Sequence, residues 1–127
     1  MKKIIIVIIV VVVVLLAVLI VSFAIKAKGM NEKLDTIGIE EMDLSDKEDG
    51  FYVGSSDAGI ISAKVRVEVE DGQVADIEII RHFNGQGEPA EMIVYDIMEK
   101  QSLMVDTVSG ATGSSKVILD AVQNALK

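Results

Sequence analysis

The sequence predicts an α+β fold: a small antiparallel sheet with helices packed on one side, preceded by a single N-terminal transmembrane helix. Three observations predict it. A long uncharged apolar segment opens the chain, two alternating segments are joined by an Asp-Gly pair, and two segments of helical periodicity follow them. A chain of 127 residues has room for one small domain plus appendages.

The apolar segment covers residues 4–25 and contains no charged side chain. As an α-helix it would be ~33 Å long, enough to cross the hydrocarbon core of a bilayer. A secretory signal peptide is the alternative, but it predicts a shorter apolar core and a small-x-small cleavage site. Here the segment runs into Lys26-Ala27-Lys28. We therefore expect an uncleaved anchor over residues 1–28, embedded in the lipid bilayer through residues 4–25.

Charge is distributed unevenly along the chain. All 20 acidic residues follow the apolar segment, and residues 29–127 contain only eight of the 12 basic residues. This balance argues against nucleic acid as a partner and against a domain that lies flat on anionic lipid. Similar numbers of lysines flank the span, so the positive-inside rule leaves its orientation open.

The residue types also exclude several kinds of site. Without cysteine there are no disulfides, thiolate metal sites, iron–sulfur clusters or cysteine nucleophiles. His82 is the single histidine, which excludes a histidine-rich metal site. No spacing of carboxylates suggests a metal cluster or an acid–base pair, so we expect no metal site and no catalytic residues. Any redox chemistry would need a bound cofactor.

Residues 29–48 form an acid-rich stretch, which we expect to be a solvated juxtamembrane stalk. Its apolar pieces, Ile37-Gly-Ile39 and Met42-Asp-Leu44, are candidates for packing on the domain. The domain itself is expected over residues 49–127.

Three strands are expected in this domain. Phe51-Tyr52-Val53 is a short strand between glycines, and residues 61–70 alternate strictly between apolar and polar side chains. Asp71-Gly72 is a strong two-residue hairpin signal. Residues 73–81 then form the partner strand, with three apolar side chains expected to face inward: Ala75, Ile77 and Ile79.

Two helices are expected after the strands, beyond a loop over residues 82–87. Pro89 suits the first turn of a helix that ends near Ser102. Residues 103–108 are expected to be extended. Ser114 or Ser115 is a candidate cap for a final helix with an apolar face. That face comprises Val117, Ile118, Ala121, Val122, Ala125 and Leu126.

The loop before the final helix places one threonine hydroxyl, that of Thr112, among small residues. Free amides at a helix start can hold a phosphate, and the helix dipole favours its negative charge. Gly110, Ala111 and Gly113 leave room for a close approach to the backbone. An ordinary Ser/Thr-rich helix cap is the alternative.

Residues 106–112, with the sequence DTVSGAT, resemble the flavinylation motif of the FMN-binding domain family. Further segments are similar to that family in the same order along residues 49–127: DGFYVG at 49–54, VEDGQV at 69–74, HFNGQG at 82–87, QSL at 101–103 and SSKV at 114–117. Thr107 and Gly113 depart from the residues that members often carry at those positions.

The resemblance implies that FMN is the cofactor and that Thr112 carries it through a phosphoester bond. A separate Mg²⁺-dependent flavin transferase would take the FMN from FAD. Asp106 would orient the loop or assist recognition by the transferase, with simple loop capping as its alternative.

The same resemblance assigns roles to the residues around the motif. Ser109, Gly110 and Ala111 would complete the binding loop, although closing the turn is slightly favoured for Ser109 over bonding the phosphate. His82 would contact the flavin or its phosphate, with a loop histidine of no chemical role as the alternative. Tyr52 and Phe83 could flank the ring, but core packing is favoured for Tyr52.

The resemblance is to flavinylated subunits of sodium-pumping NADH:quinone reductase and Rnf complexes, and to small extracytosolic flavin carriers. It implies a single-pass protein of the cell membrane with its domain outside the cytoplasm. Covalent FMN would relay electrons there between a membrane donor and an extracytoplasmic acceptor. An electron-transfer protein or redox-complex subunit is thus favoured over a self-contained enzyme. The alternative is a non-flavinylated sensory or adaptor module on the same anchor.

Overall fold

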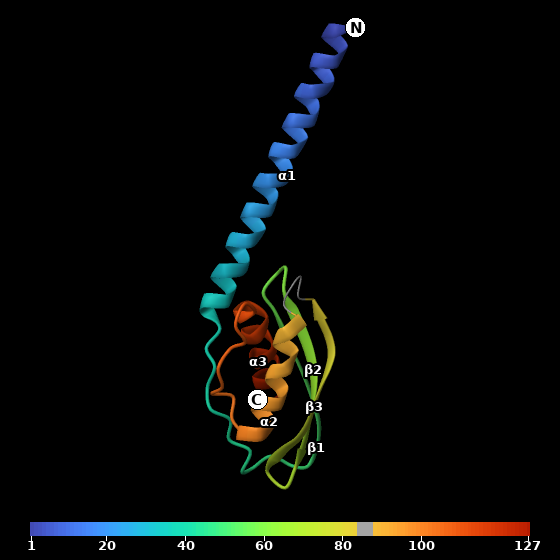
Figure 1. The fold of residues 1–127 in the computed structure, drawn as a ribbon. Coiled ribbons are helices and arrows are strands. Elements are labelled where there is room, and N and C mark those ends of the chain that lie inside the picture. The colour runs from blue at the N-terminus through green and yellow to red at the C-terminus, as the bar shows by residue number, and fades with distance from the viewer. Residues whose placement is uncertain (84–87) are drawn as a thin grey trace.

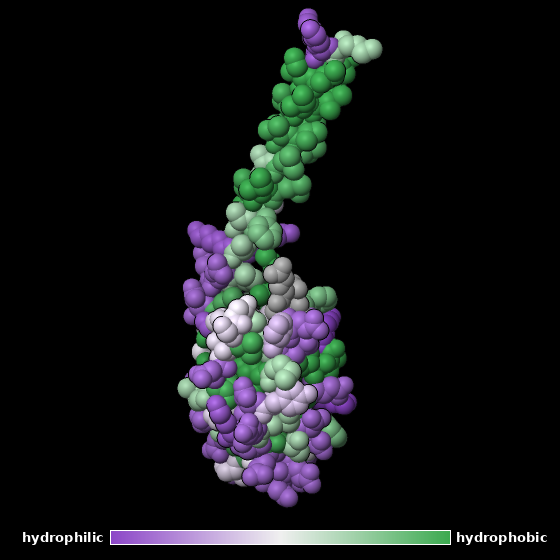
Figure 2. Space-filling model, viewed as in Figure 1, coloured by the Kyte–Doolittle hydropathy of each residue, from purple (hydrophilic) through white to green (hydrophobic). Residues whose placement is uncertain are grey.

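The computed structural model describes residues 1–83 and 88–127. Helix α1 (Lys2–Thr36) stands off a domain in which α2 and α3 lie together on one side of the sheet (Figure 1). α1 is long and apolar enough to cross a membrane. Its hydrophobic surface is continuous between hydrophilic ends (Figure 2). The helix continues past the apolar segment because residues 26–36 are mostly good helix formers.

The sheet confirms the expected α+β fold. β1 (Gly50–Asp57), β2 (Ser62–Glu70) and β3 (Gln73–Phe83) are antiparallel, with β2 in the centre. β1 is longer than the predicted strand because its pairing with β2 continues to Asp57. Asp71 and Gly72 both have positive φ angles, 52° and 73°. A two-residue hairpin turn of this kind requires that conformation, which explains the Asp-Gly pair.

β3 contains two irregularities that change which side chains face the helices. Val69 pairs with Val74 but Glu68 with Asp76, so Ala75 is the extra residue of a bulge. Likewise Val65 pairs with Ile79 but Lys64 with Arg81, which makes Ile80 a second extra residue. The prediction that Ala75 faces inward is therefore wrong: Ala75 is exposed and Val74 is buried.

The second bulge also reorients the end of β3. After Ile80, the side chain that faces the helices is that of His82, which pairs with the buried Ala63. Without a bulge, strict alternation from Ile79 would turn Arg81 inward. His82 thus belongs to a strand, and the prediction that it begins a loop is wrong.

The first helical segment divides into a 3-10 turn, η1 (Glu88–Met92), and helix α2 (Ile93–Lys100). α2 ends at Gln101, whose left-handed backbone has φ 50°. The Gln101 side chain accepts a hydrogen bond from Val74 N–H at 2.8 Å and donates to Val74 O at 2.9 Å and Met98 O at 2.7 Å. One side chain therefore joins the helix end to β3.

Helix α3 (Thr112–Leu126) packs across β1 and β2, while α2 packs on β3 (Figure 1). The approach to β1 is closest at Gly54. A Cβ atom there would lie 2.2 Å from Ala121 O and 2.3 Å from Ala125 N. Both distances are too short for any side chain to fit, so only glycine is accommodated at this position. The core lies between the two layers, and its largest fully buried residues are Ile93, Ile97, Leu103, Ile118, Val65, Val67, Val69, Val117 and Val122.

The segment between α1 and β1 lies on the domain. Leu34 and Leu44 are buried in the core cluster, and Ile37, Ile39 and Met42 are partly buried against it. Gln123 of α3 donates to Gly38 O at 2.9 Å and accepts from Glu40 N–H at 2.7 Å. The apolar pieces of this acidic segment therefore attach the end of the anchor to α3.

Candidate functional site

The start of α3 differs from the sequence prediction. The helix begins at Thr112 itself, and neither Ser114 nor Ser115 caps it. The amide of Ser115 donates to Ala111 O at 2.9 Å, the first hydrogen bond of the helix. The amides of Thr112, Gly113 and Ser114 precede that bond and have no acceptor within the helix. The predicted attachment residue therefore lies in the first turn, among the free amides.

A tight turn leads into this first turn. Ala111 N–H donates to Val108 O at 2.9 Å, and Gly110, the third residue of the turn, has a φ angle of 78°. That combination is a type II turn, whose third position favours glycine. Ser109 is exposed at the second position, and the backbone hydrogen bond closes the turn. The sequence Ser-Gly-Ala is thus explained by local geometry as well as by the resemblance.

Ser115 fixes the loop to the helix. Its hydroxyl donates to Ala111 O at 2.8 Å and accepts from Val108 N–H at 3.0 Å, and the residue is fully buried. Ser114 is buried too, at 2% exposure. Thr112, in contrast, is exposed. Among the three hydroxyls of the first turn, only that of Thr112 is open to a modifying enzyme.

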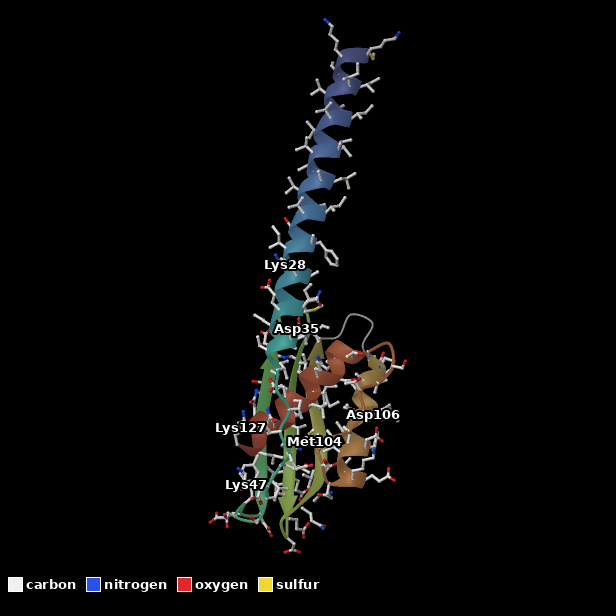
Figure 3. The ribbon with its side chains drawn as sticks, turned by 90° about the vertical axis from the view of Figure 1, so that its left-hand side faces the viewer. Lys28, Asp35, Lys47, Met104, Asp106 and Lys127 are labelled. Carbon is white, nitrogen blue, oxygen red and sulfur yellow. The ribbon has the colours of Figure 1, made fainter. Side chains whose placement is uncertain are left out.

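Asp106 and Thr107 lie in the segment between α2 and α3, and Figure 3 labels Asp106. Both are exposed, and they line a groove of about 350 Å³ together with Lys116 and Ile39. In the described part of the chain the Asp106 carboxylate makes no hydrogen bond, so no loop-capping contact is seen there. Lys116 follows Thr112 by four residues, on the same side of α3.

His82 lies on the helix-facing side of the sheet. Its side chain is only 1% exposed, and Nδ1 is 3.7 Å from Glu91 Oε1 of η1. Phe83 points to the opposite, open face and is 58% exposed, with the Arg81 guanidinium 5.5 Å from its ring centre. The remainder of the predicted loop, residues 84–87, lies outside the described residues.

The motif and His82 occupy the same end of the sheet. A Cβ atom on Gly113 would lie 3.3 Å from Ile61 Cδ1, and the next residue, Ser62, pairs with Phe83 beside His82. Tyr52 is elsewhere. It pairs with Val67 toward the hairpin end, and its hydroxyl donates to Glu48 O at 2.6 Å. Core packing, the favoured prediction for Tyr52, is what the structure has.

Gly113, a departure from the family pattern, has a packing reason. A Cβ atom there would also lie 3.2 Å from Leu34 Cδ1, at the end of α1. The first turn of α3 is therefore pressed against the end of the membrane helix. The sequence does not predict this contact, because an acid-rich stretch such as residues 29–48 is typical of a solvated stalk and assigns no role to Leu34.

These residues suit a phosphate-linked cofactor. The exposed Thr112 side chain provides an oxygen, the amides of residues 112–114 provide donors, and Gly110 and Ala111 add no bulk. A metal centre has no comparable support: within residues 1–83 and 88–127, no three His, Asp or Glu side chains are grouped as ligands.

The family model of the FMN-binding domain matches residues 58–127, more than half of the chain. The chain belongs to this family, and its cofactor is FMN. No curated protein matches the sequence. With α1 long and apolar enough to cross a membrane, the molecule has the organisation of a membrane-anchored flavin-binding protein.

Proposed function

We propose that the protein carries FMN covalently, through a phosphoester to the Thr112 hydroxyl, and relays electrons at the extracytoplasmic face of the membrane. The observation that carries this proposal is the contrast among the hydroxyls of the first turn of α3. Ser114 and Ser115 are buried, whereas Thr112 is exposed beside free amides. Family membership supports FMN as the attached group.

Attachment needs a partner enzyme, an FAD- and Mg²⁺-dependent flavin transferase. The Thr112 oxygen attacks the phosphorus of the FMN half of FAD, the bond to AMP breaks, and AMP leaves. A base of the transferase accepts the hydroxyl proton. The free amides of residues 112–114 would hold the resulting phosphodiester, whose negative charge the dipole of α3 would favour. Asp106, exposed on the adjoining flank, is a recognition residue for the transferase.

The bound flavin supplies the redox chemistry, and the protein supplies attachment, position and tuning. The attached flavin would take electrons from a reduced donor in the membrane and pass them to an oxidised acceptor outside the cytoplasm. A covalent bond is useful at that location because a freely exchanging cofactor would be lost by dilution. α1 keeps the domain next to the donor.

Intact-mass spectrometry of the full chain, co-expressed with a flavin transferase, tests the attachment. The wild type should gain the mass of one FMN, Thr112→Ala should gain none, and Thr112→Ser should regain it. Thr107→Ala is the matched control, since Thr107 is an exposed hydroxyl of the same loop. An adduct that persists in Thr112→Ala would overturn the proposal.

A non-flavinylated sensory or adaptor module is the competing function. It predicts a colourless protein after co-expression and full activity of Thr112→Ala in cells. The extracytoplasmic location has its own test, because the acidic domain should be digested by protease added to intact cells. Protection of the domain until the cells are lysed would place it in the cytoplasm.

A further inference from the structure

A cleft of about 420 Å³ lies between the end of α1 and the loop that joins β1 to β2. Helix α1 contributes Lys26, Gly29, Met30 and Lys33, which follow the spacing i, i+3, i+4, i+7 of one helix face. The loop contributes Ala58, Gly59 and Ile60. The volume falls within the usual range of cofactor sites, which are mostly apolar with a few polar groups.

The cleft adjoins the first turn of α3. Leu34 Cδ1 and Ile61 Cδ1 lie 3.2 Å and 3.3 Å from where a Cβ atom of Gly113 would be. Leu34 directly follows Lys33, and Ile61 directly follows Ile60, so each wall of the cleft continues into a residue that a Cβ atom at Gly113 would contact. Met30 precedes Leu34 by about one helical turn, or ~5.4 Å along α1. The cleft therefore begins about one helical turn from Leu34, whose side chain approaches Gly113, the residue after Thr112.

The loop wall is well defined. Ala58 N–H donates to Ile61 O at 2.9 Å, and Gly59 N–H donates to Asp57 Oδ1 at 2.6 Å. Gly59 has a φ angle of 95°, which disfavours any residue with a side chain. On the other wall, a Cβ atom at Gly29 would have no atom within 4 Å. The two glycines therefore leave open a space between two ordered walls.

We propose that the flavin ring of the FMN attached at Thr112 lies in this cleft, so that the membrane helix forms one wall of the cofactor site. Met30 and Ile60 provide apolar contact for the ring, and Lys33 provides a cation beside it. A cation stabilises the negative charge that a flavin gains on reduction, so Lys33 tunes the reduction potential. The inference rests on the proposed attachment of FMN to Thr112.

The location has a functional consequence. Lys26 lines the cleft and directly follows the apolar segment of residues 4–25. A ring held there is at the membrane surface, close to a donor dissolved or embedded in the bilayer. An anionic lipid headgroup is the other occupant that two lysines would suit. The flavin is favoured because both walls continue into side chains that approach Gly113, the residue after Thr112, and because three of the lining residues, Met30, Ala58 and Ile60, are apolar.

Two substitutions in the flavinylated full-length protein test this site. Gly29→Leu fills the cleft with a good helix former, and should displace the ring and increase quenching of its fluorescence by iodide. Lys33→Gln removes the cation, and should lower the midpoint potential in a spectroscopic redox titration. Asn31→Leu and Lys28→Gln are the matched controls, because both residues are exposed on α1 and do not line the cleft.

The outcomes separate the ring's position from its attachment. Every variant is first shown by mass to carry FMN. If all carry it and Gly29→Leu and Lys33→Gln behave as their controls, the cleft does not hold the ring, while the attachment stands. If the wild type carries no FMN, both proposals fail. The titrations are repeated in nanodiscs of phosphatidylcholine with and without phosphatidylglycerol. Effects that occur only with phosphatidylglycerol would identify a lipid site and overturn the inference.

Discussion

At its C-terminal end, α3 lies so close to β1 that backbone atoms of Ala121 and Ala125 occupy the space of a Cβ at Gly54. At its N-terminal end, the atoms of residues 1–83 and 88–127 that approach Gly113 are the tips of two flexible side chains, Leu34 and Ile61. At the C-terminal end, the backbone of α3 lies directly against the backbone of β1. At the N-terminal end, the neighbours of Gly113 are side-chain atoms, which can move. The difference separates the part of α3 that holds the fold together from the part that is left accessible for chemistry.

Burial separates the very start of the helix from the rest. Past the first turn, α3 buries Val117, Ile118, Val122 and Ala125 against the sheet. In the first turn, Ser114 and Ser115 are buried too, but Thr112 is exposed and Gly113 is only partly buried. A modification site must admit another enzyme, so the open end is where an acceptor hydroxyl can be reached. Under the proposed attachment to Thr112, the tight end would keep the helix in place during modification.

The largest effect is expected from Gly54→Ala. The added methyl would overlap backbone atoms of α3, which cannot move aside without displacing the whole helix. We expect a loss of about 3 kcal/mol or more of unfolding free energy, enough to unfold much of a domain this small. Circular dichroism of the detergent-solubilised chain measures it. Gly38→Ala is the control, because a Cβ there has no atom within 4 Å. If Gly54→Ala and Gly38→Ala had the same melting temperature, the close approach of α3 to β1 at Gly54 would be contradicted.

A smaller effect is expected from Ser115→Ala, at the boundary between the two ends. The change removes the acceptor of Val108 N–H and the donor to Ala111 O. We expect a loss of about 1–2 kcal/mol, because a partly buried amide is left without a partner. Flavinylation should slow but still occur, since Thr112 remains. Ser114→Ala, which removes no hydrogen bond among the described residues, should change the rate of FMN incorporation less. If Ser115→Ala incorporated FMN at the rate of the wild type, the turn would not need the hydrogen bonds of the Ser115 hydroxyl for modification.

The sequence could predict the elements that depend on local pattern. Alternation over residues 61–70, the Asp71-Gly72 turn and the apolar face of residues 117–126 all appear in the structure as strand, hairpin and helix. These features need no knowledge of distant contacts. The motif around Thr112 was equally visible, because a short string of small residues and hydroxyls defines it.

Features that depend on pairing could not be predicted. Two bulges in β3 determine which side of the sheet Ala75 and His82 face. A bulge is recognised only from the pairing with the neighbouring strand, which a single sequence does not reveal. The sequence predicts too late a start for α3, because Ser114 and Ser115 suit a helix cap by residue type. The hydroxyl of Ser115 instead bonds backward to the loop. The contact of Leu34 with Gly113 crosses most of the chain, and no local signal reports it.

The smallest effect is expected from Gly113→Ala, which adds the same methyl group at the open end of α3. The new Cβ would lie 3.2 Å and 3.3 Å from two side-chain tips, Leu34 Cδ1 and Ile61 Cδ1, and both can shift by a few tenths of an ångström. Alanine is also the better helix former by about 1 kcal/mol, which offsets the crowding. We therefore expect the unfolding free energy to change by less than about 1 kcal/mol. Melting curves recorded beside those of Gly54→Ala measure the contrast. A loss as large as that of Gly54→Ala would mean that the end of α1 is as rigidly fixed as the backbone of α3, and that the two ends of the helix do not differ.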